Sequence, residues 1–385
     1  MIYLDNAATS FPKPEVVYHA MDEFLRRCGA SPGRSAHRLS IEAGRVVYET
    51  RESVARLFNV TDPLRVVFTK NATEALNLVL NGILRPGDHV ITSSMEHNSV
   101  IRPLRSLEEQ GVSLTVVQCS VAGFLEPDQI KSEIRPQTRL IVLTHASNVV
   151  GTLLPVAEIG TLAREHGVLF CVDAAQTAGA YPLDMETMNV DLLAFTGHKS
   201  LFGSPGTGGL CIAPGIEDVL DPLIRGGTGS HSESEHQPSF LPDKYESGTP
   251  NTAGLAGLRA GVDFLLSLGV ETVREHEKRL MHLLIDGLRE IPGVTIHGSG
   301  DADKQVAVLS LTVAGMTSAE LAMELDEEYD ILCRPGLQCA PLAHRTMGTF
   351  PTGTARLSPG YFTTDGSISA TLEAIAAIAG RVRKG

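Results

Sequence analysis

Two patterns of apolar and polar residues alternate along residues 65–214 and predict the fold class. Short apolar runs indicate buried strands, which we expect at 65–69, 89–94, 113–119, 140–146, 168–174, 192–196 and 209–213. Between them apolar residues recur at steps of three and four, which predicts helices over residues 73–84, 100–110 and 155–166. Strands that alternate with helices are typical of an α/β protein with a doubly wound, mostly parallel sheet flanked by helices.

The pattern lapses between residues 226 and 254. This stretch is rich in Gly, Ser, Pro and charged residues, and compact domains rarely contain so long a polar loop without a function. A lid over a site and an arm toward a second subunit are the two roles that we consider. His231 and His236 lie in this loop without a cysteine or a helical His-Glu frame, so we expect solvated histidines and no metal site.

A second, smaller unit is expected near the C-terminus. Amphipathic patterns predict helices over residues 252–268 and 271–290, followed by strands at 294–297, 306–313 and 355–362. We therefore predict a large domain of residues 15–258, and a small α+β domain of residues 1–14 together with 259–385.

Composition and charge narrow the function. The chain has 385 residues, 43% of them hydrophobic, which is enough for two domains with sizeable cores. Its net charge is 32 − 45 = −13 with dispersed basic residues, so we expect no nucleic-acid partner. No apolar stretch approaches the roughly 18 residues that span a bilayer, and no basic region precedes an apolar one at the N-terminus. We expect a cytoplasmic protein without a membrane partner.

The six cysteines are expected to be reduced thiols, because the chain is long and shows no secretion signal. Cys119, Cys171 and Cys211 lie in apolar strand-like stretches and are expected in the core. Cys333 and Cys339 belong to a segment with Pro and Gly at its centre, and a loop there would keep Cys339 near solvent.

Lys199 follows an apolar strand, where an ammonium should cost free energy unless it is paired or covalently used. Partial burial also lowers the pKa of a lysine and frees its amine to attack a carbonyl. The alternative is an exposed lysine just past a strand end. Asp173 ends the preceding strand, and a lysine and an aspartate at one sheet edge fit pyridoxal phosphate, with its aldehyde and its pyridinium nitrogen.

Other polar residues lie at or just beyond strand ends, where open sheets of this type bind ligands: Thr73, His97 and Asn148. Thr73 opens a helix, whose first turn offers free N–H groups to a phosphate. Threonine followed by glutamate also caps helices without a ligand. His97 could stack on a flat cofactor, or be an ordinary surface histidine.

Four motifs in order resemble the class V aminotransferase family of pyridoxal-phosphate enzymes, and within it the cysteine desulfurase and selenocysteine lyase group. They are Ser147-Asn-Val-Val-Gly-Thr152, Val172-Asp-Ala-Ala-Gln176, Thr196-Gly-His-Lys199 and Ser247-Gly-Thr-Pro-Asn-Thr252. The resemblance extends from the Leu-Asp-Asn-Ala-Ala-Thr run at residues 4–9 to the Ala-Arg-Leu-Ser run at residues 355–358. It implies pyridoxal-phosphate fold-type I.

The resemblance also implies site roles. Lys199 would form the Schiff base, Asp173 would hold the pyridinium proton and His97 would stack on the ring and serve catalysis. The other implied cofactor contacts are Ala72, Thr73, Asn148, Gln176, Thr196 and His198. Thr249 would reach the cofactor phosphate of the neighbouring subunit in a homodimer with a shared active site. The implied substrate-binding residues are Ala7, Asn148, Arg334 and Arg356; an arginine fork suits a carboxylate.

Cys339 would decide the reaction. In cysteine desulfurases an enzyme thiolate attacks the sulfur of L-cysteine and leaves L-alanine and a persulfide, whose sulfur passes to an acceptor protein or a reductant. The alternatives are a selenocysteine lyase acting on L-selenocysteine, and an aminotransferase or β-lyase.

The loop around Cys339 departs from the family pattern. Gln338 stands where short-loop members often carry a histidine, and Pro335 stands where a small polar residue is usual. His344 and Arg334 are therefore candidates for activating Cys339. Cys333 could act as a resolving thiol, but the apolar residues before it favour a structural role.

Overall fold

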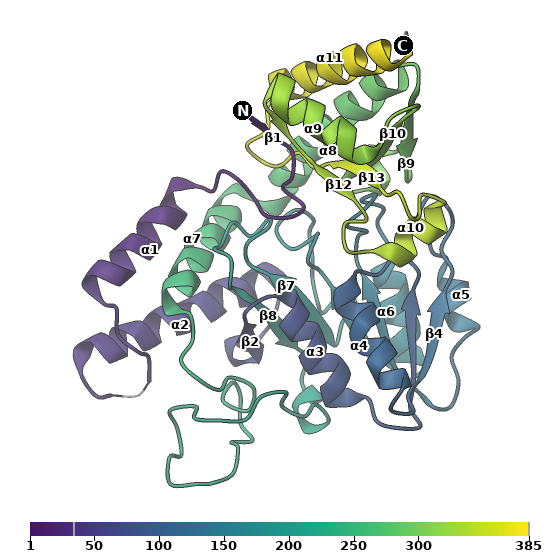
Figure 1. The fold of residues 1–385 in the computed structure, drawn as a ribbon. Coiled ribbons are helices and arrows are strands. Elements are labelled where there is room, and N and C mark those ends of the chain that lie inside the picture. The colour runs from purple at the N-terminus through teal and green to yellow at the C-terminus, as the bar shows by residue number, and fades with distance from the viewer. Residues whose placement is uncertain (34, 384–385) are drawn as a thin grey trace.

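The computed structural model describes residues 1–33 and 35–383, in which a seven-stranded sheet forms the centre of the larger of two bodies (Figure 1). The strand order is β2-β8-β7-β6-β5-β3-β4, and all pairs are parallel except those of β8. The strands are β2 (Val66–Thr69), β3 (His89–Ser93), β4 (Ser113–Val117), β5 (Thr138–Thr144), β6 (Leu169–Asp173), β7 (Leu192–Thr196) and β8 (Gly208–Ile212). The predicted mostly parallel sheet is confirmed.

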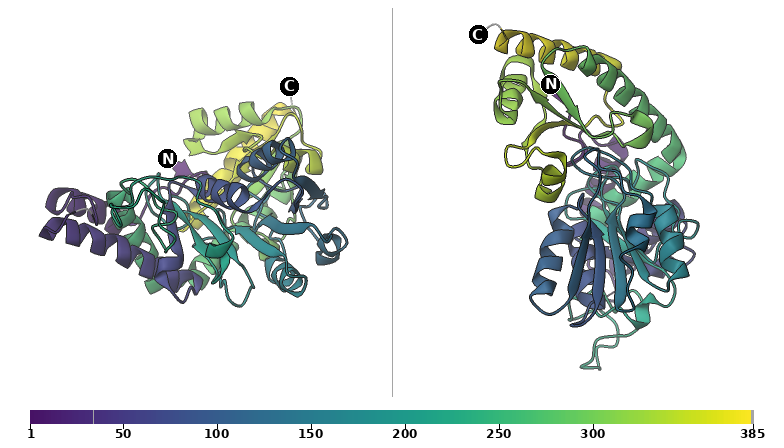
Figure 2. Two further views of the ribbon diagram at one scale, coloured as in Figure 1. Left: turned by 90° about the horizontal axis from the view of Figure 1, so that it is seen from below. Right: turned by 90° about the vertical axis from the view of Figure 1, so that its right-hand side faces the viewer.

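Both faces of the sheet are covered, which explains why its strands are apolar without alternation. Leu140 and Val142 of β5 belong to the core on one face, and Ile141 and Leu143 to the core on the other. Figure 2 shows helices on both sides of the sheet. The helices between the strands are α3 (Ala72–Ile83), α4 (Asn98–Glu108), α5 (Pro127–Lys131) and α6 (Val156–Glu165), with the 3₁₀ turns η1 (Pro63–Arg65) and η2 (Ile216–Asp218).

Two N-terminal helices extend the larger body to one side. α1 (Glu15–Arg27) and α2 (Arg38–Phe58) pack along α7 (Thr252–Leu268), the helix predicted over the same residues. Between β8 and α7 the chain forms no helix or strand beyond η2, and it projects as the long loop at the bottom of Figure 1.

The smaller body contains an antiparallel sheet in the order β12-β13-β10-β9, as expected for an α+β unit. Its strands are β9 (Val294–His297), β10 (Leu309–Val313), β12 (Arg334–Gly336) and β13 (Thr354–Leu357), and its helices are α8 (Val270–Arg289), α9 (Ser318–Tyr329), α10 (Pro341–Met347) and α11 (Asp365–Val382), with the turn η3 (Ala302–Lys304). The strand predicted at 355–362 ends at Leu357, because Pro359 and Gly360 follow.

The N-terminus joins the smaller body through β1 (Ile2–Tyr3), which pairs in parallel with β11 (Ile331–Leu332). α7 and α8 meet at Gly269 with a bend of 82°. The domain boundary predicted at residues 258 and 259 falls inside α7. No single described helix is long and apolar enough to cross a membrane, although the bent pair α7 and α8 passes that test when taken together.

Candidate active site

A cavity of about 270 Å³ lies at the carboxyl edge of the large sheet and reaches the small body. Strands β2, β3, β5, β6 and β7 all end at this edge, so residues distant in the chain meet there. The cavity is lined by twelve of the residues predicted for the site: Ala7, Ala72, Thr73, His97, Asn148, Asp173, Gln176, Thr196, His198, Lys199, Arg334 and Arg356.

Lys199 and Asp173 follow neighbouring strands, as the sequence predicted. Burial lowers the pKa of Lys199 to about 8, with Arg356 and Arg334 acting in the same direction and Asp173 against them. Its amine has no hydrogen bond or ion pair to any described residue. Asp173 is 3% exposed and accepts the N–H of Ala175 at 2.9 Å. Burial raises the pKa of Asp173, and the Lys199 charge opposes that shift.

The turn that carries Lys199 requires glycine. A Cβ at Gly197 would lie 2.2 Å from the Thr207 hydroxyl, and the N–H of Gly203 bonds the Gly197 carbonyl at 2.7 Å. This close approach keeps residues 197–203 in a tight turn directly after β7. Lys199 is thereby held at the sheet edge.

The first turn of α3 borders the same cavity. Asn71, rather than Thr73, caps this helix: its side chain accepts the N–H of Glu74 at 2.9 Å. The N–H groups of Ala72 and Thr73 belong to the first turn, which has no partners for them within the helix. The buried Thr196 hydroxyl has no partner among the described residues. This donor set fits the phosphate of pyridoxal phosphate.

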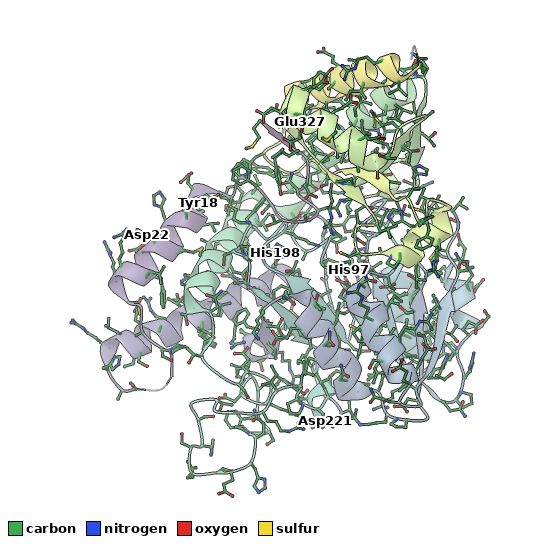
Figure 3. The ribbon with its side chains drawn as sticks, in the orientation of Figure 1. Tyr18, Asp22, His97, His198, Asp221 and Glu327 are labelled. Carbon is green, nitrogen blue, oxygen red and sulfur yellow. The ribbon has the colours of Figure 1, made fainter. Side chains whose placement is uncertain are left out.

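Two histidines flank this cavity (Figure 3). His97 caps α4, and its Nδ1 accepts the N–H of Ser99 at 3.0 Å. Burial, reinforced by the charge of Lys199, lowers the pKa of His97 to about 4. Burial and the charges of Lys199 and Lys13 lower the pKa of His198 to about 4. Both rings are therefore neutral at pH 7.

Arg356 lies on the small-body side of the cavity and is 1% exposed. Its Nη2 pairs with Asp5 at 2.6 Å, and its Nη1 donates to the Asn148 carbonyl at 2.9 Å. Its Nε is buried without a partner among the residues described. This nitrogen is therefore a buried donor that no described residue satisfies.

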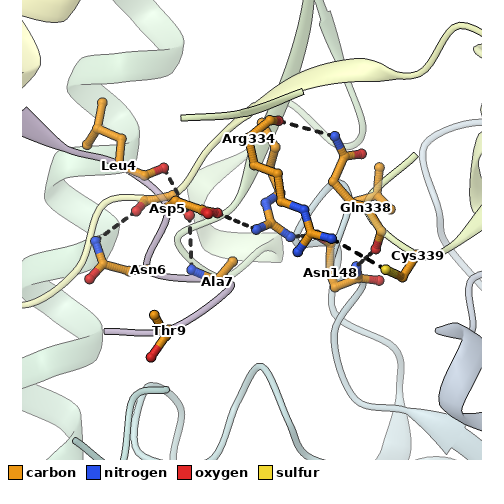
Figure 4. A network of polar contacts seen from close by, with 12 residues as sticks. Leu4, Asp5, Asn6, Ala7, Thr9, Asn148, Arg334, Gln338 and Cys339 are labelled. Atoms are coloured by element: carbon orange, nitrogen blue, oxygen red, sulfur yellow. Dashed lines mark hydrogen bonds and ion pairs between the residues drawn. The ribbon is translucent and has the colours of Figure 1, made fainter. Parts of the chain in front are cut away.

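Cys339 is exposed in the loop after β12, as predicted, and its Sγ lies 3.4 Å from Nη2 of Arg334 (Figure 4). Its carbonyl accepts the N–H of Asn98 at 2.9 Å, so the loop is attached to α4. Cys333 is half-buried, and burial raises the pKa of its thiol to about 12. His344 is buried and bonds Gln338 and Thr349, so it does not contact Cys339.

A model of the family described as Aminotransferase class-V matches residues 2–370. The chain belongs to the class V aminotransferase family. A protein of Methanothermobacter thermautotrophicus named as a probable cysteine desulfurase is 36% identical over 98% of this chain and 95% of its own length. One of Synechocystis with the same name is 33% identical over 98% of this chain and 90% of its own.

Solved structures of cysteine desulfurases share the fold of this class V chain. The enzyme of Thermococcus onnurineus superposes with a TM-score of 0.93 at 31% identity, over 98% of this chain and 94% of that one. The cysteine desulfurase CsdA of Escherichia coli gives a TM-score of 0.86 at 29% identity, over 99% and 94%.

Two of the residues predicted for the site, Cys339 and Thr249, do not line the cavity of Lys199. Thr249 is exposed and lines a second cavity of about 520 Å³, together with Arg51, Phe68 and Lys70. It does not line the cavity of Lys199.

The sequence analysis did not identify two carboxylates that lie near the cavity, Asp5 and Glu96. Asp5 pairs with Arg356 from a segment 351 residues away. Glu96 is fully buried, accepts the Ser93 hydroxyl at 2.6 Å and the Thr144 N–H at 2.9 Å, and has its pKa raised by burial to about 8. The contact of Asp5 with Arg356 and that of Glu96 with Thr144 depend on tertiary structure. Within the Met-Glu-His run the sequence analysis identified only His97 as a candidate.

Proposed function

We propose that this class V aminotransferase is a pyridoxal-phosphate-dependent cysteine desulfurase. It would convert L-cysteine to L-alanine and receive the sulfur on Cys339 as a persulfide. The observation that carries this proposal is the exposed thiol of Cys339 beside Arg334, at the rim of the cavity that Lys199 and Asp173 line. The names of the similar proteins support the same reaction.

The chain's own residues fit the cofactor. The first turn of α3 and the hydroxyl of Thr196 would hold the phosphate, Asp173 would pair with the pyridine nitrogen, and Lys199 would bind the aldehyde. Gln176, His97, His198 and Asn148 would complete its surroundings. When bound, pyridoxal phosphate withdraws electrons from the α-carbon of the amino acid.

Arginines suit the substrate carboxylate. Arg356 has a free Nε, and Arg334 lies near enough to influence the pKa of Lys199, so two positive charges face one cavity. Ala7 and Asn148 line the same wall. The amine of Lys199, with a pKa of about 8, can accept and return protons of the bound amino acid near neutral pH.

Cys339 would carry out the sulfur transfer. Its thiolate donates an electron pair to the substrate sulfur and forms the S–S bond, while the C–S bond breaks and its electron pair stays with the β-carbon. A proton then adds to that carbon. The balance is L-cysteine plus the Cys339 thiol to L-alanine plus the Cys339 persulfide, without an external oxidant. A reductant or an acceptor protein would remove the sulfur in the next half-reaction.

The test is a product assay with purified, cofactor-loaded protein and L-cysteine. Alanine as the main product, lost in Cys339→Ala while the cofactor absorbance still responds to L-cysteine, supports the proposal. Pyruvate as the main product would indicate a β-lyase, and full activity of Cys339→Ala would refute the nucleophile assignment. L-selenocysteine in a parallel assay measures the preference between the two chalcogens.

The functional unit we propose is a homodimer with a shared active site. Apolar side chains are exposed on α1 and α2 and on the chain around Thr249, and a dimer would bury them: Val16, Tyr18, Leu25, Ile41, Tyr48, Leu223 and Ile224. Thr249 does not line the cavity of Lys199 in its own chain, which is consistent with a role in the active site of the neighbouring subunit.

A further inference from the structure

We propose that Gln338 is the positioning residue of the nucleophile, through a buried amide that holds both Cys339 and Arg334 in place. The inference rests on the proposed function, in which Cys339 attacks the substrate sulfur. Many members of the family carry a histidine at this position, whereas this chain carries Gln338, whose side-chain amide does not titrate.

The backbone at this position is strained. Gln338 has φ of +42° and Cys339 has φ of +61°, so two successive residues other than glycine are left-handed. Each such residue is strained and persists only where its surroundings over-determine it. Gln338 is 2% exposed, whereas its neighbour Cys339 is exposed. The buried side chain of Gln338 is therefore the anchor of the turn.

Both polar atoms of that side chain have partners. Its Nε2 donates to the carbonyls of Thr354 at 2.9 Å and Arg334 at 3.3 Å. The backbone carbonyl of Gln338 accepts a hydrogen bond from Nδ2 of Asn148 at 2.7 Å. Since two carbonyls face one end of the amide, that end is the NH₂ group, and Oε1 must face Nε2 of His344, 2.8 Å away.

This orientation settles the state of His344. Its Nε2 must carry a hydrogen in order to donate to Oε1, so its Nδ1 accepts the Thr349 hydroxyl at 2.7 Å. Burial lowers the pKa of His344 to about 4, which keeps the ring neutral. A neutral pair of Gln338 and His344 thus links the loop to α10 without adding a charge beside the thiol.

The side-chain amide of Gln338 also positions Arg334, the residue beside the nucleophile. It holds the Arg334 carbonyl, while the Arg334 guanidinium contacts Sγ of Cys339 at 3.4 Å (Figure 4). Thr354, whose carbonyl accepts a bond from the Gln338 amide, is itself held by further hydrogen bonds. Its hydroxyl donates to the Ser310 hydroxyl at 2.8 Å, and the Ser310 hydroxyl donates to the Val149 carbonyl at 2.7 Å. Gln338 therefore connects the nucleophile to a rigid sheet.

The first experiment replaces Gln338 by methionine, which keeps the side-chain length and removes the side-chain polar contacts, and by glutamate, which keeps an acceptor but loses both donated bonds. We expect kcat for alanine formation to fall on the order of 10- to 100-fold in both, because misplacement of a reacting group by about 1 Å has that effect. KM for L-cysteine should rise as well, because the same amide holds Arg334, which we assign to the substrate carboxylate, whereas the absorbance spectrum of the bound cofactor should not change. Gln118→Ala is the control, since Gln118 touches α10 only through Thr346.

A second readout does not depend on turnover. Hydrogen–deuterium exchange of the peptide that carries Cys339 should be several-fold faster in Gln338→Met than in the wild type, because the turn loses its bonds to Arg334, Thr354 and His344. Thr349→Val, which removes only the bonds of that hydroxyl to His344, should speed this exchange by less.

Each outcome has one meaning. Wild-type rates in Gln338→Met and Gln338→Glu, or unchanged hydrogen exchange of the Cys339 peptide, would overturn the role of Gln338 even if the wild type makes alanine. Failure of the wild type to make alanine would instead refute the proposed function. Should Gln338→Met not fold, Gln338→Glu and Thr349→Val carry the same test.

Discussion

Lys199 and Cys339, the two residues of the proposed chemistry, differ in their exposure to solvent. Lys199 lies in a cavity with an unpaired amine, and burial brings its pKa to about 8. Cys339 is exposed on a loop and has a guanidinium beside its sulfur. Desolvation prepares Lys199 for its reaction, whereas Cys339 is prepared by its position on an exposed loop.

The pKa of Lys199 predicts how the protein takes up its cofactor. Only the free amine attacks an aldehyde, so the rate of pyridoxal-phosphate incorporation into cofactor-free protein should rise with pH and level off above about 8. Stopped-flow absorbance measures this rate. A half-maximum near 10.5, the ordinary lysine value, would contradict the assigned burial. Lys199→Ala, the control, should give no such absorbance band.

The sequence was sufficient for the residues that follow strands. Lys199, Asp173 and His97 each come directly after an apolar run, and parallel strands bring such positions to one edge. Asp5, Glu96 and Gln338 could not be identified in this way. Their partners lie far away in the chain or have ordinary sequence surroundings, so only the folded structure reveals their contacts.

At the scale of elements, one buried ion pair connects α2 to the long loop before α7. Arg51 is 4% exposed and pairs through both nitrogens with Glu246, whose Oε1 also accepts the Phe68 N–H at 2.6 Å. α2, β2 and the loop are thus joined at one carboxylate. The guanidinium also lies 4.6 Å from the Phe68 ring.

Arg51→Ala should lower the free energy of unfolding by about 3–5 kcal/mol, because it leaves the Glu246 carboxylate without its charge partner. Urea unfolding followed by circular dichroism measures the change. Arg45→Ala is the matched control on the same helix, where both ion pairs are solvent-exposed, and its unfolding midpoint should not move. Equal midpoints for the two variants would contradict the account.

Strands of the large sheet were predictable because both of their faces are buried and their sequences are continuously apolar. β1, β11 and β12 were not predicted, since two or three residues show no periodicity. Several helices were missed as well: α1, α2, α5, α9, α10 and α11. In α1 a signal was present, because Val17 and Phe24 lie on one buried face, although Val16 and Leu25 are exposed.

At the scale of the whole molecule, the two bodies meet around a buried carboxyl. Glu277 of α8 is 5% exposed, lines a small cavity with Ser10 and Gln176, and has no hydrogen bond or ion pair within the described chain. Burial raises its pKa to about 8, while the charge of Arg274 opposes the shift. The folded protein therefore holds a proton here that the unfolded chain releases above pH 4.5.

Stability should respond to pH accordingly. Between about pH 4.5 and 8 the folded state binds more protons than the unfolded one, so this group makes stability fall by about 1.4 kcal/mol per pH unit. Glu277→Gln removes that loss, and its advantage over the wild type in urea unfolding should grow from pH 5 to pH 8. Glu275→Gln, exposed on the same helix, should show no such trend. An advantage of Glu277→Gln that is equal at all pH values would contradict the burial of this carboxyl.

The proposed dimer gives a prediction on mixing subunits. Lys199→Ala removes the amine from its own site, whereas Thr249→Ala alters the neighbour's. A mixed dimer should therefore contain one intact site, and co-refolding the two variants should raise activity above the mean of the separate proteins. Light scattering on the wild type should give the mass of two chains. A monomer with full activity would exclude the shared site.

Sulfur transfer to Cys339 can be measured as the mass of the Cys339 peptide after one turnover with L-cysteine and no reductant. We expect one additional sulfur atom on Cys339 for each alanine released, and none on Cys333, whose thiol has a pKa of about 12. Alanine or pyruvate released while the Cys339 peptide keeps its original mass would contradict this expectation.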